Sequence, residues 1–189
     1  MHPFSNTPYP ITVCGLEELS RLAGGGVSHV ISILDPDWPD PPEFAAYSGG
    51  WRKVLRFHDV IDETVGMVAP SAADSRVVLD LARELRSARV DGLLVHCHAG
   101  VSRSTAVVAT LLAEVIPFDD ARIFAEITRI RPWSWPNSRM VGFADTLLGR
   151  QGRLLTALRE HYRRMIDAWP ERAALIRDSN RAREYLLAG

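Results

Sequence analysis

The stretch that decides the fold runs from Leu93 to Thr105 and has the sequence LLVHCHAGVSRST. With Gly92 in front, its first part up to His96 is a brief apolar run, which indicates a short buried strand. The segment Thr105–Val115 is longer and apolar and predicts a buried helix. The intervening residues 97–104 therefore form a loop that joins the end of a strand to the start of a helix.

Such a loop is suited to binding an anion. Backbone N–H groups at a helix N-terminus have no intrahelical partner, and the helix dipole places partial positive charge there, so phosphate binds well. Gly100 permits a backbone conformation in which successive amides point inward, and the planar guanidinium of Arg103 can hold two phosphate oxygens at once. We expect the following residues to contact a bound phosphate: His98, Ala99, Gly100, Val101, Ser102 and Arg103.

Cys97 lies in the same positive field and is the predicted nucleophile. A helix N-terminus and a neighbouring arginine favour the thiolate form of a cysteine, and the thiolate is the form that attacks. Ser104 is expected to hydrogen-bond the sulfur and to help it leave in a second chemical step. A cysteine and an arginine at this spacing are a weak signal alone. The preceding His96, the glycine and the serines on both sides of Arg103 make an accidental match improbable.

The segment His96–Ser104 resembles the signature of the cysteine-based protein tyrosine phosphatases, and its part Ala99–Ser104 is closest to the dual-specificity branch. A second similarity lies in Arg131–Asn137, followed by a Phe-x-x-x-Leu pattern that begins at Phe143. Together the resemblance covers roughly residues 10–150. It implies a phosphomonoester hydrolase that needs no metal or cofactor and works through a cysteinyl-phosphate intermediate.

The leaving group of such a reaction is an alkoxide or phenolate and needs a proton from a carboxylic acid. The resemblance implies an aspartate on the loop after the strand that precedes the long helix. The predicted strand is Lys53–His58, and Asp59 follows it directly, which favours Asp59 as the catalytic acid. Asp62 is the alternative. The carboxylate that is not the acid is expected to cap a turn.

The order of elements predicts an α/β fold, with a central, mostly parallel sheet of four to five strands flanked by helices in three layers. The predicted strands are Ile11–Cys14, Ser28–Leu34, Lys53–His58 and Gly92–His96. The predicted helices are Leu16–Ala23, 71–87, Thr105–Val115, Asp119–Arg131, Ser138–Leu148, Gly152–Trp169 and Glu171–Leu187. Residues 35–50 and the chain from Asp59 to Pro70 are predicted loops. Ligands of such sheets bind at the carboxyl ends of strands, where Cys97 and Asp59 both fall.

Length and composition indicate one domain over residues 1–189, with a helical extension at about 150–189. Nine arginines and five acidic residues stand in that extension. We expect an amphipathic helix that packs on the domain with a basic face in solvent, and a docking or dimer helix is the alternative.

The formal net charge is −1, so no global field argues for nucleic acid as a partner. No apolar run has the length of a membrane span, and no secretory signal begins the chain. Cys14 and Cys97 form no disulfide framework, and a nucleophilic thiol suits a reducing compartment, so we expect a cytoplasmic protein. Cys14 is expected to be a small buried strand residue, with a redox pairing to Cys97 as the alternative.

Other functions remain open at this point. A phosphatase-like module that binds phosphoproteins without turnover is one, and a sulfurtransferase is another. Within the phosphatase interpretation, the loop contains only His98 as an extra basic residue and a neutral Val101, which favours a phosphorylated protein, phosphotyrosine included, over a phosphoinositide. The chain lacks a Lys-Asn-Arg-Tyr segment like the one that deepens the pocket of classical tyrosine-specific members, so a shallow site is expected.

Overall fold

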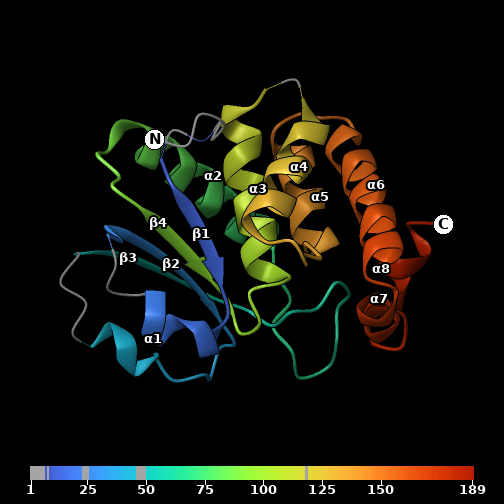
Figure 1. Ribbon diagram of the computed structural model, residues 1–189, viewed down its shortest axis with the longest axis horizontal. Coiled ribbons are helices and arrows are strands. Elements are labelled where there is room, and N and C mark those ends of the chain that lie inside the picture. Colours follow the sequence, from blue (N-terminus) through green and yellow to red (C-terminus); the bar gives the residue numbers. More distant parts are fainter. Residues whose placement is uncertain (1–6, 8, 23–25, 46–49, 118) are drawn as a thin grey trace.

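A single parallel sheet forms the centre of the protein (Figure 1). The structure is a computed structural model, and it describes residues 7, 9–22, 26–45, 50–117 and 119–189. Within these ranges the strands are β1 (Ile11–Cys14), β2 (His29–Leu34), β3 (Trp51–Arg56) and β4 (Leu93–His96). Their order is β1-β4-β2-β3, and every neighbouring pair is parallel. The predicted α/β class is thus confirmed, with four strands and a fully parallel sheet.

Helices cover both faces of the sheet unequally. One side carries α2 (Ala72–Ser87), α3 (Arg103–Val115), α4 (Asp120–Ile130), α5 (Ser138–Leu147) and α6 (Arg153–Ala168), with α7 (Pro170–Arg177) and α8 (Ala182–Leu186) at the far end (Figure 1). The other side carries only a 3-10 turn η1 (Leu16–Glu18), the single-turn helix α1 (Leu19–Leu22) and a second 3-10 turn η2 (Pro42–Phe44). The third layer is therefore thin.

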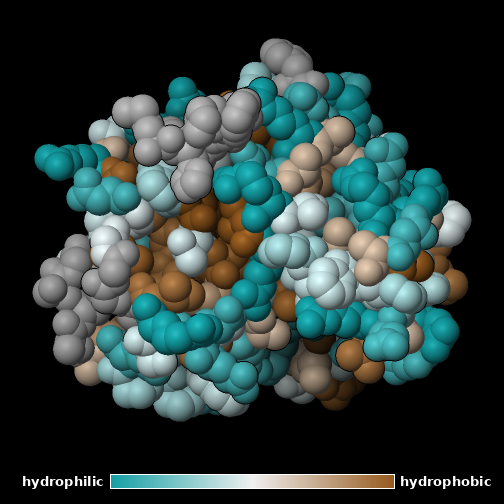
Figure 2. All heavy atoms as spheres, in the orientation of Figure 1, coloured by the Kyte–Doolittle hydropathy of each residue, from teal (hydrophilic) through white to brown (hydrophobic). Residues whose placement is uncertain are grey.

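Alternation along the strands explains why both faces are buried. Successive strand side chains point to opposite faces. In β4, Leu93 and Val95 belong to the large core beneath the helices, whereas Leu94 packs in a smaller cluster with Leu19 and Phe44. Every residue of β2 and of β4 is buried, as the near-continuous apolar runs predicted. Figure 2 shows apolar residues over the strands of the face in view and mostly hydrophilic residues over the helices.

Strand β3 ends earlier than the predicted segment Lys53–His58. After Arg56 only Phe57 still donates its N–H to β2, at 3.0 Å from the Leu34 oxygen. The N–H of His58 instead donates to Val68 O at 2.8 Å, and its ring Nδ1 accepts from Val68 N–H at 2.9 Å. The chain therefore leaves the sheet before His58. Asp59 stands three residues beyond the strand rather than directly after it.

The prediction of one helix over Glu171–Leu187 was wrong, because the chain forms α7 and α8 with a break between them. Ser179 lies in the break, where its hydroxyl donates to Ile176 O at 2.8 Å and accepts from Arg181 N–H at 3.1 Å. Serine, aspartate and asparagine side chains compete in this way for backbone groups and interrupt helices. Arg181 consequently stands between the two helices.

The other predicted helices begin and end within two residues of their observed bounds, apart from the first. That segment forms η1 and α1, and Ala23, its last predicted residue, lies outside the described residues. The predicted loop 35–50 contains η2, and its residues 46–49 are also outside the described part. In the part of the chain that the structure describes, no helix is long and apolar enough to cross a lipid bilayer.

Candidate active site

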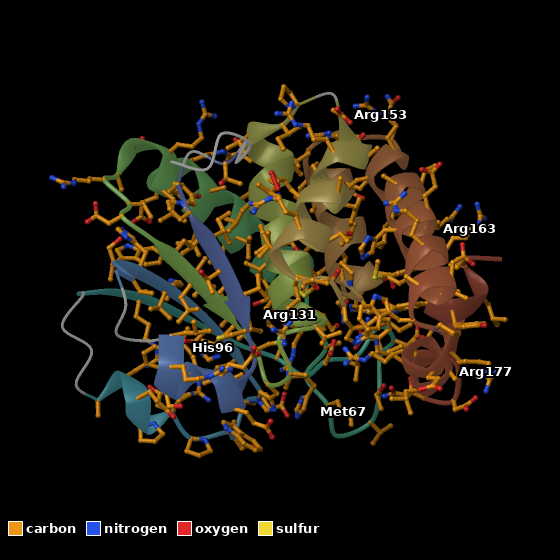
Figure 3. The ribbon with its side chains drawn as sticks, in the orientation of Figure 1. Met67, His96, Arg131, Arg153, Arg163 and Arg177 are labelled. Atoms are coloured by element: carbon orange, nitrogen blue, oxygen red, sulfur yellow. The ribbon has the colours of Figure 1, made fainter. Side chains whose placement is uncertain are left out.

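The loop that follows β4 lies at the edge where all strands end. Cys14 of β1 and Ser32 of β2 both stand in register with His96 of β4. Because the strands are parallel, the residues that follow each of them meet at this edge. Figure 3 shows His96 and Arg131 in this region of the molecule.

The carbonyl groups of the loop point outward and are bonded by its neighbours. His98 O accepts from Leu16 N–H at 2.9 Å, Ala99 O from Arg131 Nη2 at 3.2 Å, Val101 O from Trp135 N–H at 2.9 Å, and Ser102 O from Ala106 N–H at 2.9 Å. Among the described residues, no protein acceptor lies within hydrogen-bond range of the N–H groups of residues 98–102. A row of free backbone donors at a helix N-terminus is an anion-binding arrangement.

Gly100 makes the bend of this loop possible. Its φ is +68°, a left-handed conformation that residues with a Cβ rarely adopt. A Cβ on Gly100 would lie 2.3 Å from the carbonyl carbon of Cys14 and 2.5 Å from the nitrogen of Gly15. Both are backbone atoms at the end of β1, so the loop and the strand approach each other more closely than any side chain allows.

Gly100→Ala is therefore expected to lower the free energy of unfolding by at least about 2 kcal/mol, because it adds a steric clash to backbone strain. Gly149→Ala is the matched control. Gly149 also has a positive φ, of 63°, but its added Cβ meets nothing within 4 Å, so about 1 kcal/mol is expected. Urea unfolding of both variants measures the difference. Equal losses would contradict a tight approach of the loop to β1.

Cys97 is buried at the base of the loop, with its Sγ 3.2 Å from the hydroxyl of Ser104. Ser104 lies in the first turn of α3 and is fully buried, so its hydroxyl is held beside the sulfur. The second cysteine has a different environment. Cys14 belongs to the small cluster on the opposite face of the sheet, and burial, reinforced by the charge of Glu18, raises the pKa of its thiol to about 12. Cys14 therefore stays a thiol. It also lies in a different cluster from Cys97, which belongs to the large core.

Arg103 is buried, and neighbouring protein groups bind one side of its guanidinium. Its Nη1 donates to Asp35 Oδ1 at 2.6 Å and to Phe57 O at 2.7 Å. Its Nε is buried and has no hydrogen-bond partner among the described residues. An unpaired donor on a buried cation is costly, and an anionic oxygen is the partner that would satisfy it. Asp35 and Phe57 therefore fix the guanidinium and leave its Nε free for a ligand.

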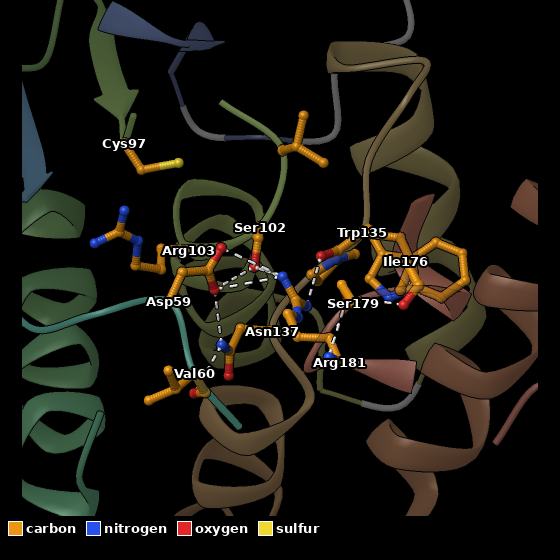
Figure 4. A network of polar contacts seen from close by, with 12 residues as sticks. Asp59, Val60, Cys97, Ser102, Arg103, Trp135, Asn137, Ile176, Ser179 and Arg181 are labelled. Carbon is orange, nitrogen blue, oxygen red and sulfur yellow. Dashed lines mark hydrogen bonds and ion pairs between the residues drawn. The ribbon is translucent and has the colours of Figure 1, made fainter. Parts of the chain in front are cut away.

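Asp59 lies against the loop after β4 from its other side (Figure 4). Its Oδ1 accepts from Ser102 Oγ at 2.7 Å and from Asn137 Nδ2 at 3.0 Å, and its Oδ2 lies 3.3 Å from Nη1 of Arg181. The same Asn137 amide donates to Val60 O at 3.2 Å and thereby fixes the chain next to Asp59. Figure 4 shows the Asp59 carboxylate between the guanidinium groups of Arg103 and Arg181.

These contacts decide the ionisation of Asp59. Burial of the carboxyl favours its neutral form, but the charges of Arg181 and Arg103 outweigh burial, with help from the hydrogen bonds of Asn137 and Ser102. The pKa of Asp59 therefore lies below its ordinary value. A phosphate dianion in the loop would oppose this shift, because a second negative charge nearby favours the protonated carboxyl.

Asp62, the alternative acid, points elsewhere. Its carboxylate pairs with Arg183 of α8 at 2.8 Å, and more than half of its side chain is exposed. The neighbouring Glu63 pairs with Arg139 of α5. Asp62 does not cap a turn through its side chain as expected, since its recorded partner is an arginine 121 residues further along the chain. The structure thus brings Asp59, and not Asp62, to the loop.

The two histidines beside Cys97 are both neutral at pH 7. His96 Nε2 lies 2.7 Å from Ser32 Oγ, and burial lowers the pKa of His96 to about 4. His98 Nε2 accepts from Asp35 N–H at 3.3 Å, and its ring packs 4.5 Å from that of Trp38. Burial and then the charge of Arg103 lower the pKa of His98. Arg103 is therefore the loop's cation at neutral pH.

Sequence reasoning missed two of these residues. Asp35 follows β2, the neighbour of β4, so its place after a buried strand was an available signal. Arg181 stands in the C-terminal extension, and nothing in its local sequence indicates a place at the loop. Asn137 lies in the second segment that resembles the family, and its place in the sequence predicts no contact with Asp59. No cluster of three His, Cys, Asp or Glu side chains with metal-ligand geometry occurs among the described residues.

Comparisons with known proteins identify the fold. No family model and no curated protein sequence matches the chain. Among solved structures, human DUSP28 is 19% identical with a TM-score of 0.51, over 74% of this chain and 94% of that chain. The phosphatase domain of Yvh1 from Chaetomium thermophilum is 17% identical with a TM-score of 0.54, over 76% and 93%.

A third similar structure is the human tyrosine phosphatase-like serine/threonine/tyrosine-interacting protein, 21% identical with a TM-score of 0.54, over 73% of this chain and 87% of that one. In all three, about a quarter of the present chain lies outside the match. At these identities the likeness concerns the arrangement of the backbone. The chain therefore has the fold of the cysteine-based protein tyrosine phosphatases, in the form found in their dual-specificity branch.

Proposed function

We propose that this protein is a phosphomonoester hydrolase of the dual-specificity protein tyrosine phosphatase type, in which Cys97 is the nucleophile and no metal takes part. The observation that carries the proposal is the buried, unpartnered Nε of Arg103, which lies on the same loop as Cys97 and the free backbone amides. A tetrahedral phosphate would satisfy these donors together.

In the first step, the Cys97 thiolate attacks phosphorus opposite the leaving oxygen. The P–S bond forms while the P–O bond to the leaving group breaks, and protonated Asp59 gives its proton to the departing oxygen. Arg103 and the amides of residues 98–102 stabilise the charge on the other three oxygens. Such positioning and charge stabilisation supply most of the catalysis in phosphoryl transfer.

In the second step, the Asp59 carboxylate takes a proton from water, which attacks the phosphorus of the cysteinyl-phosphate. The P–S bond breaks, inorganic phosphate forms and the thiolate leaves. The Ser104 hydroxyl, 3.2 Å from Sγ, donates a hydrogen bond that stabilises the departing sulfur. Asp59 serves as acid and then as base, so it has to lie at the loop in both protonation states.

The proposed substrate is a phosphorylated protein, with phosphotyrosine included. Because His98 is neutral, the loop carries one positive side chain, which suits a single phosphate better than a polyphosphorylated headgroup. The ring of Trp38 packs on His98 and is 44% exposed, so it offers an aromatic surface beside the loop. A thiol nucleophile works best in a reducing compartment such as the cytoplasm, the location we propose.

Hydrolysis of p-nitrophenyl phosphate by the purified protein tests the proposal. We expect turnover that is unchanged by EDTA, because Arg103 and the backbone donors supply the charge stabilisation that a metal provides elsewhere. Loss of activity with EDTA and its return with an added divalent ion would contradict the mechanism. No hydrolysis with retained binding of a phosphopeptide would instead favour a binding module, and preference for inositol lipids in a substrate panel would reassign the substrate class.

A further inference from the structure

The C-terminal extension reaches the proposed catalytic site through the side chain of Arg181. Arg181 is 6% exposed and lies in the break between α7 and α8. Its Nη1 donates to the hydroxyl of Ser102 and lies 3.3 and 3.4 Å from the two oxygens of Asp59. Figure 4 shows this guanidinium on the side of Asp59 opposite Arg103. Residues separated by 122 positions in the sequence thus form one ion pair.

The other side of Arg181 is fixed by Glu184, which is fully buried. The Nε of Arg181 donates to Glu184 Oε2 at 2.8 Å, and Nη2 lies 2.5 Å from the same carboxylate. Glu184 in turn accepts from Trp135 Nε1 at 2.9 Å and from Ser138 N–H at 2.7 Å. Glu184 therefore anchors the arginine to the segment that precedes α5, and the guanidinium has little freedom to turn away from Asp59.

Ser102 completes the arrangement. Its hydroxyl accepts from Arg181 and donates to Asp59 Oδ1 at 2.7 Å, so one loop residue contacts both partners of the ion pair. The buried charge of Arg181 would be balanced by Glu184 alone. Its second contact is to Asp59, and with Arg103 included the cluster contains two arginines and three carboxylates, those of Asp35, Asp59 and Glu184. That contact joins the break before α8 to Asp59.

We propose that Arg181 is a positioning residue for catalysis, which holds the carboxylate of Asp59 at the phosphate-binding loop and keeps it ionised until phosphate enters. The proposal rests on the proposed function of Asp59 as acid and base. The C-terminal extension would then take part in the reaction, because the charge of Arg181 influences the pH range in which Asp59 is protonated.

The direction of the pH effect follows from the charges that face Asp59. Arg181 and Arg103 favour the carboxylate. Two further titratable groups that interact with Asp59, His98 and Tyr162, are neutral at pH 7 because burial lowers the pKa of His98 and raises that of Tyr162. Cys97 belongs to the same proposed site and is unchanged in the variants that test Arg181. The first step needs protonated Asp59, so kcat/KM falls as pH rises through the pKa of Asp59. Removing the charge of Arg181 raises that pKa and moves the alkaline limb to higher pH.

Arg181→Met is the variant that tests the proposal. We expect the alkaline limb of kcat/KM to move up by about one to three pH units, the usual effect of one neighbouring charge. The plateau is expected to fall by about 10- to 100-fold, because Asp59 loses its fixed position. The titration of the Asp59 carboxyl carbon, followed by NMR and assigned with Asp59→Asn, should move by the same number of units. In an Asp59→Asn background, Arg181→Met should leave the pH profile unchanged.

Arg183→Met is the matched control. Arg183 lies two residues further on, and its partner is the exposed Asp62, so its loss should move neither the profile nor the titration. If Arg181→Met does not fold, Arg181→Lys replaces it: the retained charge should leave the limb near that of wild type, while the shorter reach lowers the plateau.

An Asp59 titration in Arg181→Met that superimposes on wild type would overturn the proposal, whatever the loss of stability. For Arg181→Lys, a plateau equal to that of wild type would do the same. The NMR titration needs no turnover. A wild-type protein without hydrolysis would therefore refute the proposed function alone, and the titration would still decide the role of Arg181.

Discussion

Cys97→Ser is expected to reduce hydrolysis of p-nitrophenyl phosphate by about 10⁴-fold or more, since loss of a nucleophile removes the covalent route altogether. A serine hydroxyl is not ionised near neutral pH. The two histidines next to it in the chain make other contacts: His96 Nε2 lies 2.7 Å from Ser32 Oγ, and His98 Nε2 accepts from Asp35 N–H. The side chain keeps almost the same volume, so the loop should keep its shape.

Phosphate binding should survive this substitution, because the backbone donors and Arg103 are untouched. Calorimetry with a phosphopeptide measures it. Cys14→Ala is the matched control, since Cys14 is buried on the opposite face of the sheet and its loss should leave kcat per folded molecule unchanged. Turnover that persists in Cys97→Ser, or that is lost in Cys14→Ala, would show that Cys97 is not the nucleophile.

Asp59→Asn is expected to lower kcat by about 10²- to 10⁴-fold, the usual contribution of a positioned general acid. The loss should be larger for phenyl phosphate than for p-nitrophenyl phosphate, because a more basic leaving group depends more on protonation. The amide keeps the shape of the carboxyl but carries no proton to donate. The fall of kcat/KM on the alkaline side, which reports deprotonation of Asp59, should disappear.

Asp62→Asn is the matched comparison and is expected to leave kcat near wild type. Its carboxylate is exposed and paired with Arg183, where a surface ion pair contributes about 1 kcal/mol or less to stability. Initial rates over a pH series with both substrates separate the two variants. A large loss in Asp62→Asn together with a normal Asp59→Asn would overturn the assignment of the acid.

Local sequence pattern was enough to predict the elements of the proposed site that are neighbours in the chain. The strand, loop and helix around Cys97 follow from apolar runs and from one glycine, and they appear within two residues of their predicted bounds. Pattern failed where a side chain competes with the backbone. The ring of His58 accepts a hydrogen bond from the N–H of Val68, and β3 ends before it. The hydroxyl of Ser179 bonds backbone groups in the break that divides the last predicted helix. Neither competition changes the hydrophobic periodicity, so periodicity does not reveal it.

The sequence by itself indicated Cys97 as the proposed nucleophile, Arg103 as its partner and the loop between them, because residues six positions apart can meet without help from the rest of the molecule. Only the tertiary structure decided their partners. Asp35 grips Arg103 across 68 positions, and Asp59 meets Ser102 across 43 and Arg181 across 122. Equivalent carboxylates at Asp59 and Asp62 differ only in where packing points them, and hydrogen bonds and ion pairs form within a few ångströms. Strand order and the break before α8 decide which side chains come within that range.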